Sequence, residues 1–122
     1  MSRRIRVAIL EASAEVHVAI AALPAAEPDV DVVRPARTAA ELAGLCDAGV
    51  DVLIADLGIL GRSDGEPLQM FRSRCPHVRV VLTTSGEEGE YRDAAARLAA
   101  DVWLPKTRLA GELLEALRRI AT

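Results

Sequence analysis

Four polar residues of types that do chemistry each follow an apolar run: Glu11, Asp56, Thr84 and Lys106. Asp56 comes directly after Val-Leu-Ile-Ala, where an unpaired charge would be costly to bury. If these runs are strands of one parallel sheet, two acids, a hydroxyl and an amine meet beyond its carboxyl edge, where such sheets bind ligands. Taken singly, each is an ordinary loop, cap or surface residue. Their joint arrival at strand ends favours a functional site.

Two hydrophobic periods alternate along the chain and predict the elements that position these residues. Short runs rich in β-branched residues predict five strands buried on both faces, at residues 5–10, 30–33, 50–56, 78–83 and 101–104. Helical spacing predicts a helix after each strand, at residues 14–23, from 38, around 68–71, at 87–99 and from 109 to the end. Pro24 and Pro76 are expected to end the first and third helices, and Thr38 with Glu41 has the spacing of a capping box. The segment from Gly58 to Gly65 is expected to form a glycine-rich loop.

Strict alternation of strands and helices predicts an α/β fold with a mostly parallel sheet covered on both faces. Right-handed crossovers leave few ways to wind five such units, and the strand order 2-1-3-4-5 is favoured. The fold class is therefore a doubly wound five-stranded sheet with five helices, a flavodoxin-like three-layer sandwich. A length of 122 residues suits one domain over 1–122.

Composition argues against several classes of partner. The net charge is −3 and the arginines are scattered, whereas nucleic-acid binding needs a concentrated basic face. No apolar segment is long enough to span a membrane or to form a signal peptide. We therefore expect a cytoplasmic protein with neither nucleic-acid nor membrane binding. Cys46 and Cys75 fit no metal or disulfide framework, and Cys46 is expected to be a small buried hydrophobe.

The order and spacing of these motifs resemble the receiver domain of bacterial two-component response regulators. The resemblance covers essentially the whole chain. It rests on four segments: Ile5-Arg-Val-Ala-Ile-Leu-Glu11, Val50-Asp-Val-Leu-Ile-Ala-Asp56-Leu with the loop through Asp64-Gly65, Val80-Val-Leu-Thr-Thr84-Ser85, and Ala100-Asp-Val-Trp103-Leu-Pro-Lys106.

The resemblance implies a phosphorelay signalling module, not an enzyme, in which Asp56 accepts a phosphoryl group from a histidine kinase or a phosphotransfer protein. A carboxylate is a competent nucleophile when a divalent cation screens the incoming phosphate. The implied Mg²⁺ ligands are Glu11, Asp56 and the backbone carbonyl of Gly58. Lys106 and the hydroxyl of Thr84 are implied to contact phosphoryl oxygens.

The resemblance also implies a switch, in which Thr84 moves toward the phosphoryl group and the aromatic residue Trp103 turns inward. The output face would comprise helix 87–99, strand 101–104 and the last helix, and a homodimer would form through it. Simple packing at the sheet edge is an equally good interpretation of Trp103.

Three positions depart from the pattern of the family. The family has two adjacent acids after the first strand, and the second of them binds the metal directly, but here the pair is Glu11-Ala12. Because affinity for a hard cation follows the number of anionic oxygens, magnesium binding is expected to be weak. Leu60 stands where proline is common, and Thr107 follows Lys106 in place of the frequent proline.

Two alternative functions follow. Ala12 favours a pseudo-receiver, a module for protein interactions that does not depend on phosphorylation, whereas the retained Asp56, Thr84 and Lys106 favour the phosphorylated form. A flavodoxin-like cofactor binder is a more distant alternative. It would need a phosphate-binding loop rich in Ser, Thr and Gly after the first strand, and Glu11-Ala-Ser-Ala-Glu15 is acidic and lacks glycine.

Overall fold

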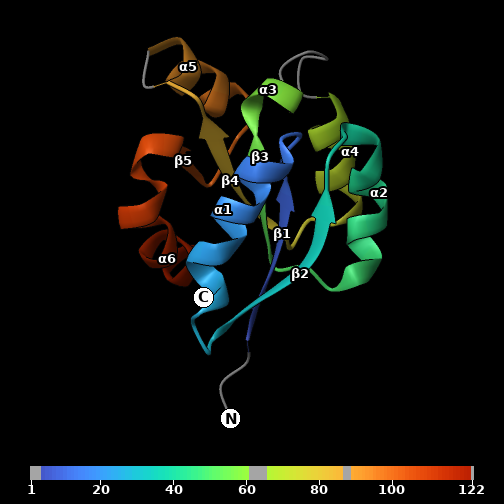
Figure 1. Ribbon diagram of the computed structural model, residues 1–122. Coiled ribbons are helices and arrows are strands. Elements are labelled where there is room, and N and C mark those ends of the chain that lie inside the picture. The colour runs from blue at the N-terminus through green and yellow to red at the C-terminus, as the bar shows by residue number, and fades with distance from the viewer. Residues whose placement is uncertain (1–3, 61–65, 87–88, 122) are drawn as a thin grey trace.

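A computed structural model describes residues 4–60, 66–86 and 89–121, which form a five-stranded parallel sheet with helices on both faces (Figure 1). The strands are β1 (Ile5–Leu10), β2 (Val30–Ala36), β3 (Val52–Asp56), β4 (Arg79–Thr84) and β5 (Val102–Pro105). Their order is β2-β1-β3-β4-β5, and every neighbouring pair is parallel. The predicted fold class and strand order are confirmed.

The helices of the described residues are α1 (Ala14–Ala25), α2 (Leu42–Leu45), α3 (Leu57–Leu60), α4 (Glu66–Arg74), α5 (Gly89–Arg97) and α6 (Leu109–Ile120). Short 3₁₀ turns flank α2 at 39–41 (η1) and 46–48 (η2), and another, η4 (Lys106–Arg108), precedes α6. The turn α3 begins the segment expected to be a loop. Its helical form follows from Leu57 and Leu60, which are both buried at i, i+3 spacing.

Two apolar cores lie on opposite faces of the sheet, because successive strand residues point to opposite faces. On one face, Val7, Ile9, Val52 and Ile54 pack with residues of α1 and α6. On the other face, residues of the same strands such as Leu53 pack with α2, α3, α4 and α5. Figure 1 shows α1 and α6 over one face, and α2 and α4 side by side over the other. The result is the predicted three-layer sandwich.

Two prolines fall inside elements. The first helix was expected to stop at Pro24, but α1 continues to Ala25 with Pro24 buried in its last turn. A proline this close to the C-terminus of a helix removes a single intrahelical hydrogen bond, so the turn survives. The strand β2 extends past the expected 30–33 to Ala36 and includes Pro35. As β2 is an edge strand, it tolerates the missing N–H.

The expected capping box at the second helix forms only in part. The Glu41 Oε1 atom accepts hydrogen bonds from the Arg37 backbone N–H (3.3 Å) and the Thr38 hydroxyl (3.2 Å). The Thr38 side chain makes no capping bond to the helix backbone. The hydroxyl that would cap the turn is donated to the carboxylate, and the helix begins as a 3₁₀ turn.

The interpretation of the cysteines was wrong, since Cys46 and Cys75 form a disulfide with their Cα atoms 5.8 Å apart. Cys46 lies in η2 and Cys75 follows α4, on the same face of the sheet. Their separation of 29 residues spans β3. The crossovers of a parallel sheet bring such segments together, and no local spacing of cysteines indicates this.

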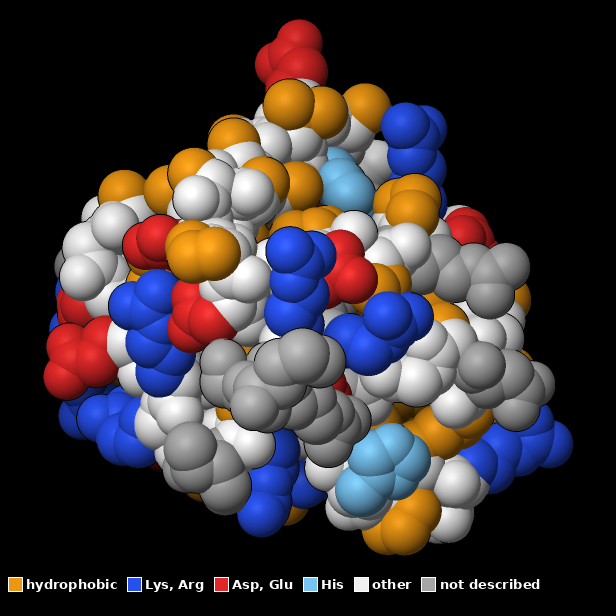
Figure 2. Space-filling model, turned by 90° about the horizontal axis from the view of Figure 1, so that it is seen from below, with side chains coloured by type: hydrophobic (Ala, Val, Ile, Leu, Met, Phe, Trp, Pro, Cys, Tyr) orange, Lys and Arg blue, Asp and Glu red, His pale blue; other side chains and the backbone are white. Residues whose placement is uncertain are grey.

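Surface charge agrees with the scatter seen in the sequence. On the face shown in Figure 2, basic side chains are interspersed with acidic ones. The last helix is joined to the segment before β2 by a two-pronged ion pair, in which Arg118 Nε and Nη2 donate to Asp29 Oδ2 (2.9 Å) and Oδ1 (3.0 Å). Within the three described segments, each helix is too short or too polar to cross a membrane.

Candidate functional site

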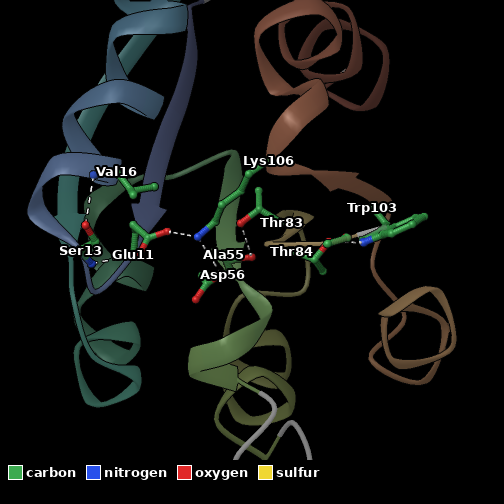
Figure 3. A network of polar contacts seen from close by, with 10 residues as sticks. Glu11, Ser13, Val16, Ala55, Asp56, Thr83, Thr84, Trp103 and Lys106 are labelled. Carbon is green, nitrogen blue, oxygen red and sulfur yellow. Dashed lines mark hydrogen bonds and ion pairs between the residues drawn. The ribbon is translucent and has the colours of Figure 1, made fainter. Parts of the chain in front are cut away.

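The register of the sheet brings the four candidate residues to its carboxyl edge. Glu11 directly follows β1, Asp56 ends β3, Thr84 ends β4, and Lys106 directly follows β5. Leu10 pairs with Ala55 across β1 and β3, so Glu11 and Asp56 leave neighbouring strands at the same level. Figure 3 shows Glu11, Asp56 and Lys106 pointing toward one another in front of the strand ends.

Lys106 joins the two acids. Its Nζ atom lies 2.7 Å from Glu11 Oε1 and 3.2 Å from Asp56 Oδ1. The side chains of Glu11 and Asp56 are only 4% and 17% exposed, and that of Lys106 is 25% exposed. Two largely buried carboxylates therefore share one ammonium group, whose positive charge offsets one of their two negative charges.

This pairing changes the titration of the lysine. Partial burial of the ammonium group disfavours its charged form, but the hydrogen bond that it donates to Glu11 and the charge of Asp56 outweigh that effect. The pKa of Lys106 is therefore raised above its ordinary value. Lys106 is also the chain's single lysine.

Glu11 is fixed by a second contact at the start of α1. The Glu11 Oε2 atom accepts a hydrogen bond from the Ser13 backbone N–H at 3.0 Å. Ser13 in turn is the N-cap of α1, and its hydroxyl accepts from the Val16 N–H at 3.3 Å. Both carboxylate oxygens of Glu11 thus have partners within the protein. Ser13 was not predicted to belong to the site, although a serine just before a helix is a cap signal.

Gly58 lets the chain approach the Asp56 carboxylate closely. A Cβ atom at position 58 would lie 3.0 Å from Asp56 Oδ2, closer than ordinary packing allows. A larger residue here would require the Asp56 carboxylate to shift by a few tenths of an ångström. The glycine therefore lets the carboxylate keep its position.

Thr84 belongs to a second polar cluster, beside the triad of Glu11, Asp56 and Lys106. Its buried hydroxyl donates to the Gly86 carbonyl at 2.6 Å and accepts from the Trp103 indole Nε1–H at 3.1 Å. Figure 3 shows Thr84 and Trp103 on the side of the site away from Glu11. The Arg92 guanidinium of α5 lies 5.5 Å from the centre of the Trp103 ring, a cation–π distance. Nothing in the local sequence identified Arg92.

The residues present do not fit a resident magnesium ion in this arrangement. Mg²⁺ requires an octahedral set of oxygens, of which one or two are usually carboxylates. Both carboxylate oxygens of Glu11 are hydrogen-bonded, the side chain of Ala12 has no oxygen, and the Lys106 ammonium group lies between Glu11 and Asp56. In the described part of the chain, no group of three His, Cys, Asp or Glu residues could hold a metal. The three predicted ligands Glu11, Asp56 and Gly58 stay a prediction.

Solved structures of similar fold are response regulators and their receiver domains. The RcsB response regulator of Salmonella typhimurium matches with a TM-score of 0.84 and 20% identity, over 98% of this chain and 60% of that chain. The response regulator domain of CheB from Thermotoga maritima matches at 0.82 and 22%, over 98% and 97%. A LuxR-family response regulator from Aurantimonas matches at 0.85 and 20%, over 97% and 85%.

At these identities the likeness shows that the chain has the receiver fold. Neither a protein-family model nor a curated protein matches it. The chain spans 60% of the length of the RcsB chain. RcsB has also been solved in complex with DNA.

Proposed function

We propose that residues 1–122 are a receiver-type signalling domain in which Asp56 accepts a phosphoryl group. The observation that supports this is the position of Lys106 Nζ, 3.2 Å from Asp56 Oδ1 at the carboxyl edge of the sheet. A cation at this distance can neutralise phosphoryl oxygens as negative charge develops on them. Gly58 has no Cβ atom beside the other carboxylate oxygen, Oδ2, where one would lie 3.0 Å away.

The chemical step is a displacement at phosphorus. An Asp56 carboxylate oxygen attacks the phosphorus of a phosphohistidine on a partner kinase or phosphotransfer protein. An O–P bond forms, the P–N bond breaks, and the imidazole nitrogen keeps the electron pair and takes up a proton. Lys106 turns toward the phosphoryl oxygens and leaves Glu11. Because Glu11 and Ala12 do not form a metal site here, no part of this step is assigned to magnesium; the weak Mg²⁺ site expected from the sequence stays a prediction.

The new charge is expected to reach the output face through the second polar cluster. Movement of the Thr84 hydroxyl toward the phosphoryl group would break its bonds to Gly86 and Trp103. Trp103 packs against Arg92 of α5, so the face made by α5, β5 and α6 would respond. The output is a change in protein contacts, including a homodimer through this face, rather than catalysis or direct nucleic-acid binding. We expect it in the cytoplasm.

The test is to incubate the protein with acetyl phosphate, with and without magnesium, and then to measure its intact mass by mass spectrometry. The unaltered chain should gain one phosphoryl group and Asp56→Asn should gain none. Asp93→Asn, the same change at an exposed position of α5, is the matched control and should be phosphorylated like the unaltered chain. An adduct on Asp56→Asn would refute Asp56 as the acceptor.

A second candidate function is a pseudo-receiver. It is favoured by Glu11, whose two oxygens hold Ser13 and Lys106 in place without a phosphoryl group or a metal. The variant Ala12→Asp separates the two functions. If the unaltered chain gains no phosphoryl group and Ala12→Asp gains one, the lost acid has silenced the site and the pseudo-receiver becomes the better description. The flavodoxin-like alternative is least supported, because the carboxylate of Glu11 already holds the N–H at the start of α1.

A further inference from the structure

An apolar groove separates α4 from the segment of η1 and α2. Its volume is about 480 Å³. The wall formed by η1 and α2 contributes three small side chains, Ala39, Ala40 and Ala43, together with Leu42. The opposite wall of α4 contributes Pro67, Met70 and Phe71. Met70 is 58% exposed and lines the groove, so its apolar side chain is accessible to a partner there.

The charges along α4 are arranged symmetrically about Met70. Glu66, Met70 and Arg74 are four residues apart, and all three line the groove. At about 1.5 Å of rise per residue, the two charged residues lie roughly 6 Å to either side of Met70 along the helix. Both are exposed, and neither forms an ion pair with another described residue. Helix-dipole compensation accounts for an acid at the start and a base at the end of α4, but not for their shared face with Met70.

We propose that a second copy of this chain docks in the groove, with the two α4 helices antiparallel about a two-fold axis at Met70. In a two-fold interface the same patch meets itself, so each residue must complement its symmetry mate. Here Glu66 would pair with Arg74 of the partner subunit, and Arg74 with Glu66 of the partner subunit. Met70 would meet its counterpart on the axis, and the alanine wall would allow close approach.

Charge complementarity is the reason to choose a second copy over another partner. A groove with an acid at one end and a base at the other is complementary to its own antiparallel image. The surface differs from the α5, β5 and α6 face, so the proposal does not depend on phosphorylation of Asp56. It goes beyond the proposed function and can hold whether or not that function does.

The experiment is sedimentation equilibrium of the unaltered chain and of charge variants over a wide range of concentration. The unaltered chain should dimerise. Glu66→Arg and Arg74→Glu should each be monomers, because like charges would face each other at both ends. A mixture of these two variants should form a heterodimer, because one contributes two bases and the other two acids. The double variant E66R/R74E should dimerise again.

Arg97→Glu is the matched control, since it makes the same charge change at an exposed position of α5 and should leave the dimer intact. Far-ultraviolet circular dichroism verifies that every variant is folded. Met70→Cys should additionally cross-link two chains under mild oxidation. A chain that is monomeric at every concentration overturns the proposal and leaves the groove to another partner. A dimer that survives Glu66→Arg, or dissociates with Arg97→Glu, also overturns it by placing the interface elsewhere.

Discussion

The ammonium group of Lys106 lies closer to Glu11 Oε1, at 2.7 Å, than to Asp56 Oδ1, at 3.2 Å. The contact with Glu11 is also the more deeply buried, so removing one of its partners costs more than it would at an exposed ion pair. We expect Glu11→Gln to lower the free energy of unfolding by about 1–3 kcal/mol, since the buried charge-assisted hydrogen bond is weakened. Urea unfolding measures the change. Glu15→Gln, at an exposed position of α1, should stay within about 0.5 kcal/mol; equal stability of the two variants would contradict the role given to Glu11.

The raised pKa of Lys106 predicts a dependence of stability on alkaline pH. The unfolded lysine titrates near 10.5, and the folded one titrates higher. Its contribution to stability is therefore fully present below 10.5 and is lost as the pH rises through the folded value. The difference in unfolding free energy between the unaltered chain and Lys106→Met should be constant at neutral pH and shrink in strong alkali. Urea unfolding over a pH series tests this, and a difference that grows with alkali would be inconsistent with it.

Adjacent threonines at the end of β4 should respond differently to the same substitution. Thr84→Val leaves the Trp103 indole N–H and the Gly86 carbonyl without their partner, which should cost about 1–3 kcal/mol and shift the emission of the single tryptophan. Thr83→Val is the matched control, because that hydroxyl makes one long bond of 3.4 Å to the Ala55 carbonyl. It should cost less and leave the emission unchanged. Similar spectra for both variants would show that the Trp103 bond is absent in solution.

The end of α5 offers a stabilising substitution. Ala99 has a φ of 55°, in the left-handed region that favours glycine. Ala99→Gly should raise the free energy of unfolding by up to about 1 kcal/mol, even though glycine gives the unfolded chain more freedom. Ala96→Gly, inside the preceding helix α5, should lower the free energy of unfolding by about 0.5–1 kcal/mol. Thermal unfolding of the pair is the measurement, and shifts of the same sign would argue against the left-handed conformation.

The pairing of Cys46 with Cys75 predicts that an oxidised sample has no thiol to alkylate until it is reduced. Replacing both cysteines by alanine should lower the free energy of unfolding by about 3 to 4 kcal/mol, from the chain-entropy estimate for a loop of 29 residues. Mass spectrometry after iodoacetamide treatment measures the number of free thiols. Urea unfolding measures the loss of stability in the double variant. Two alkylated cysteines without prior reduction would mean that the pair is a dithiol.

Most of the fold could be predicted from the sequence, because strands buried on both faces leave long apolar runs and the amphipathic helices leave a different period. The order of the strands followed from the handedness of crossovers. The prediction was wrong at Pro24, because a proline in the last turn of a helix removes only one hydrogen bond. It was also wrong for the cysteines, because their contact is made only in the folded chain. No window of sequence reports that η2 lies beside the end of α4.

The sequence predicted which residues of the site lie close together. It did not predict which hydrogen bonds they form. Strand ends placed Glu11, Asp56 and Lys106 together, as the structure has them. The bonds of Glu11 to Ser13 and of Thr84 to Trp103 depend on side-chain rotamers that packing selects. Arg92 was missed because a cation over a ring depends on the angle between α5 and β5, and no residue spacing encodes that angle.

The single lysine of the protein, Lys106, lies between Glu11 and Asp56, so the site also holds the protein's one side-chain amine. Any reagent or modifying enzyme that seeks a side-chain amine finds it only at Lys106, between the two acids and 25% exposed. Acylation there would remove the ammonium charge and leave Glu11 and Asp56 facing each other. A tag or a support attached through lysine would for the same reason be attached at the site and would perturb it. Labels that must leave the site unperturbed should be attached to other side chains.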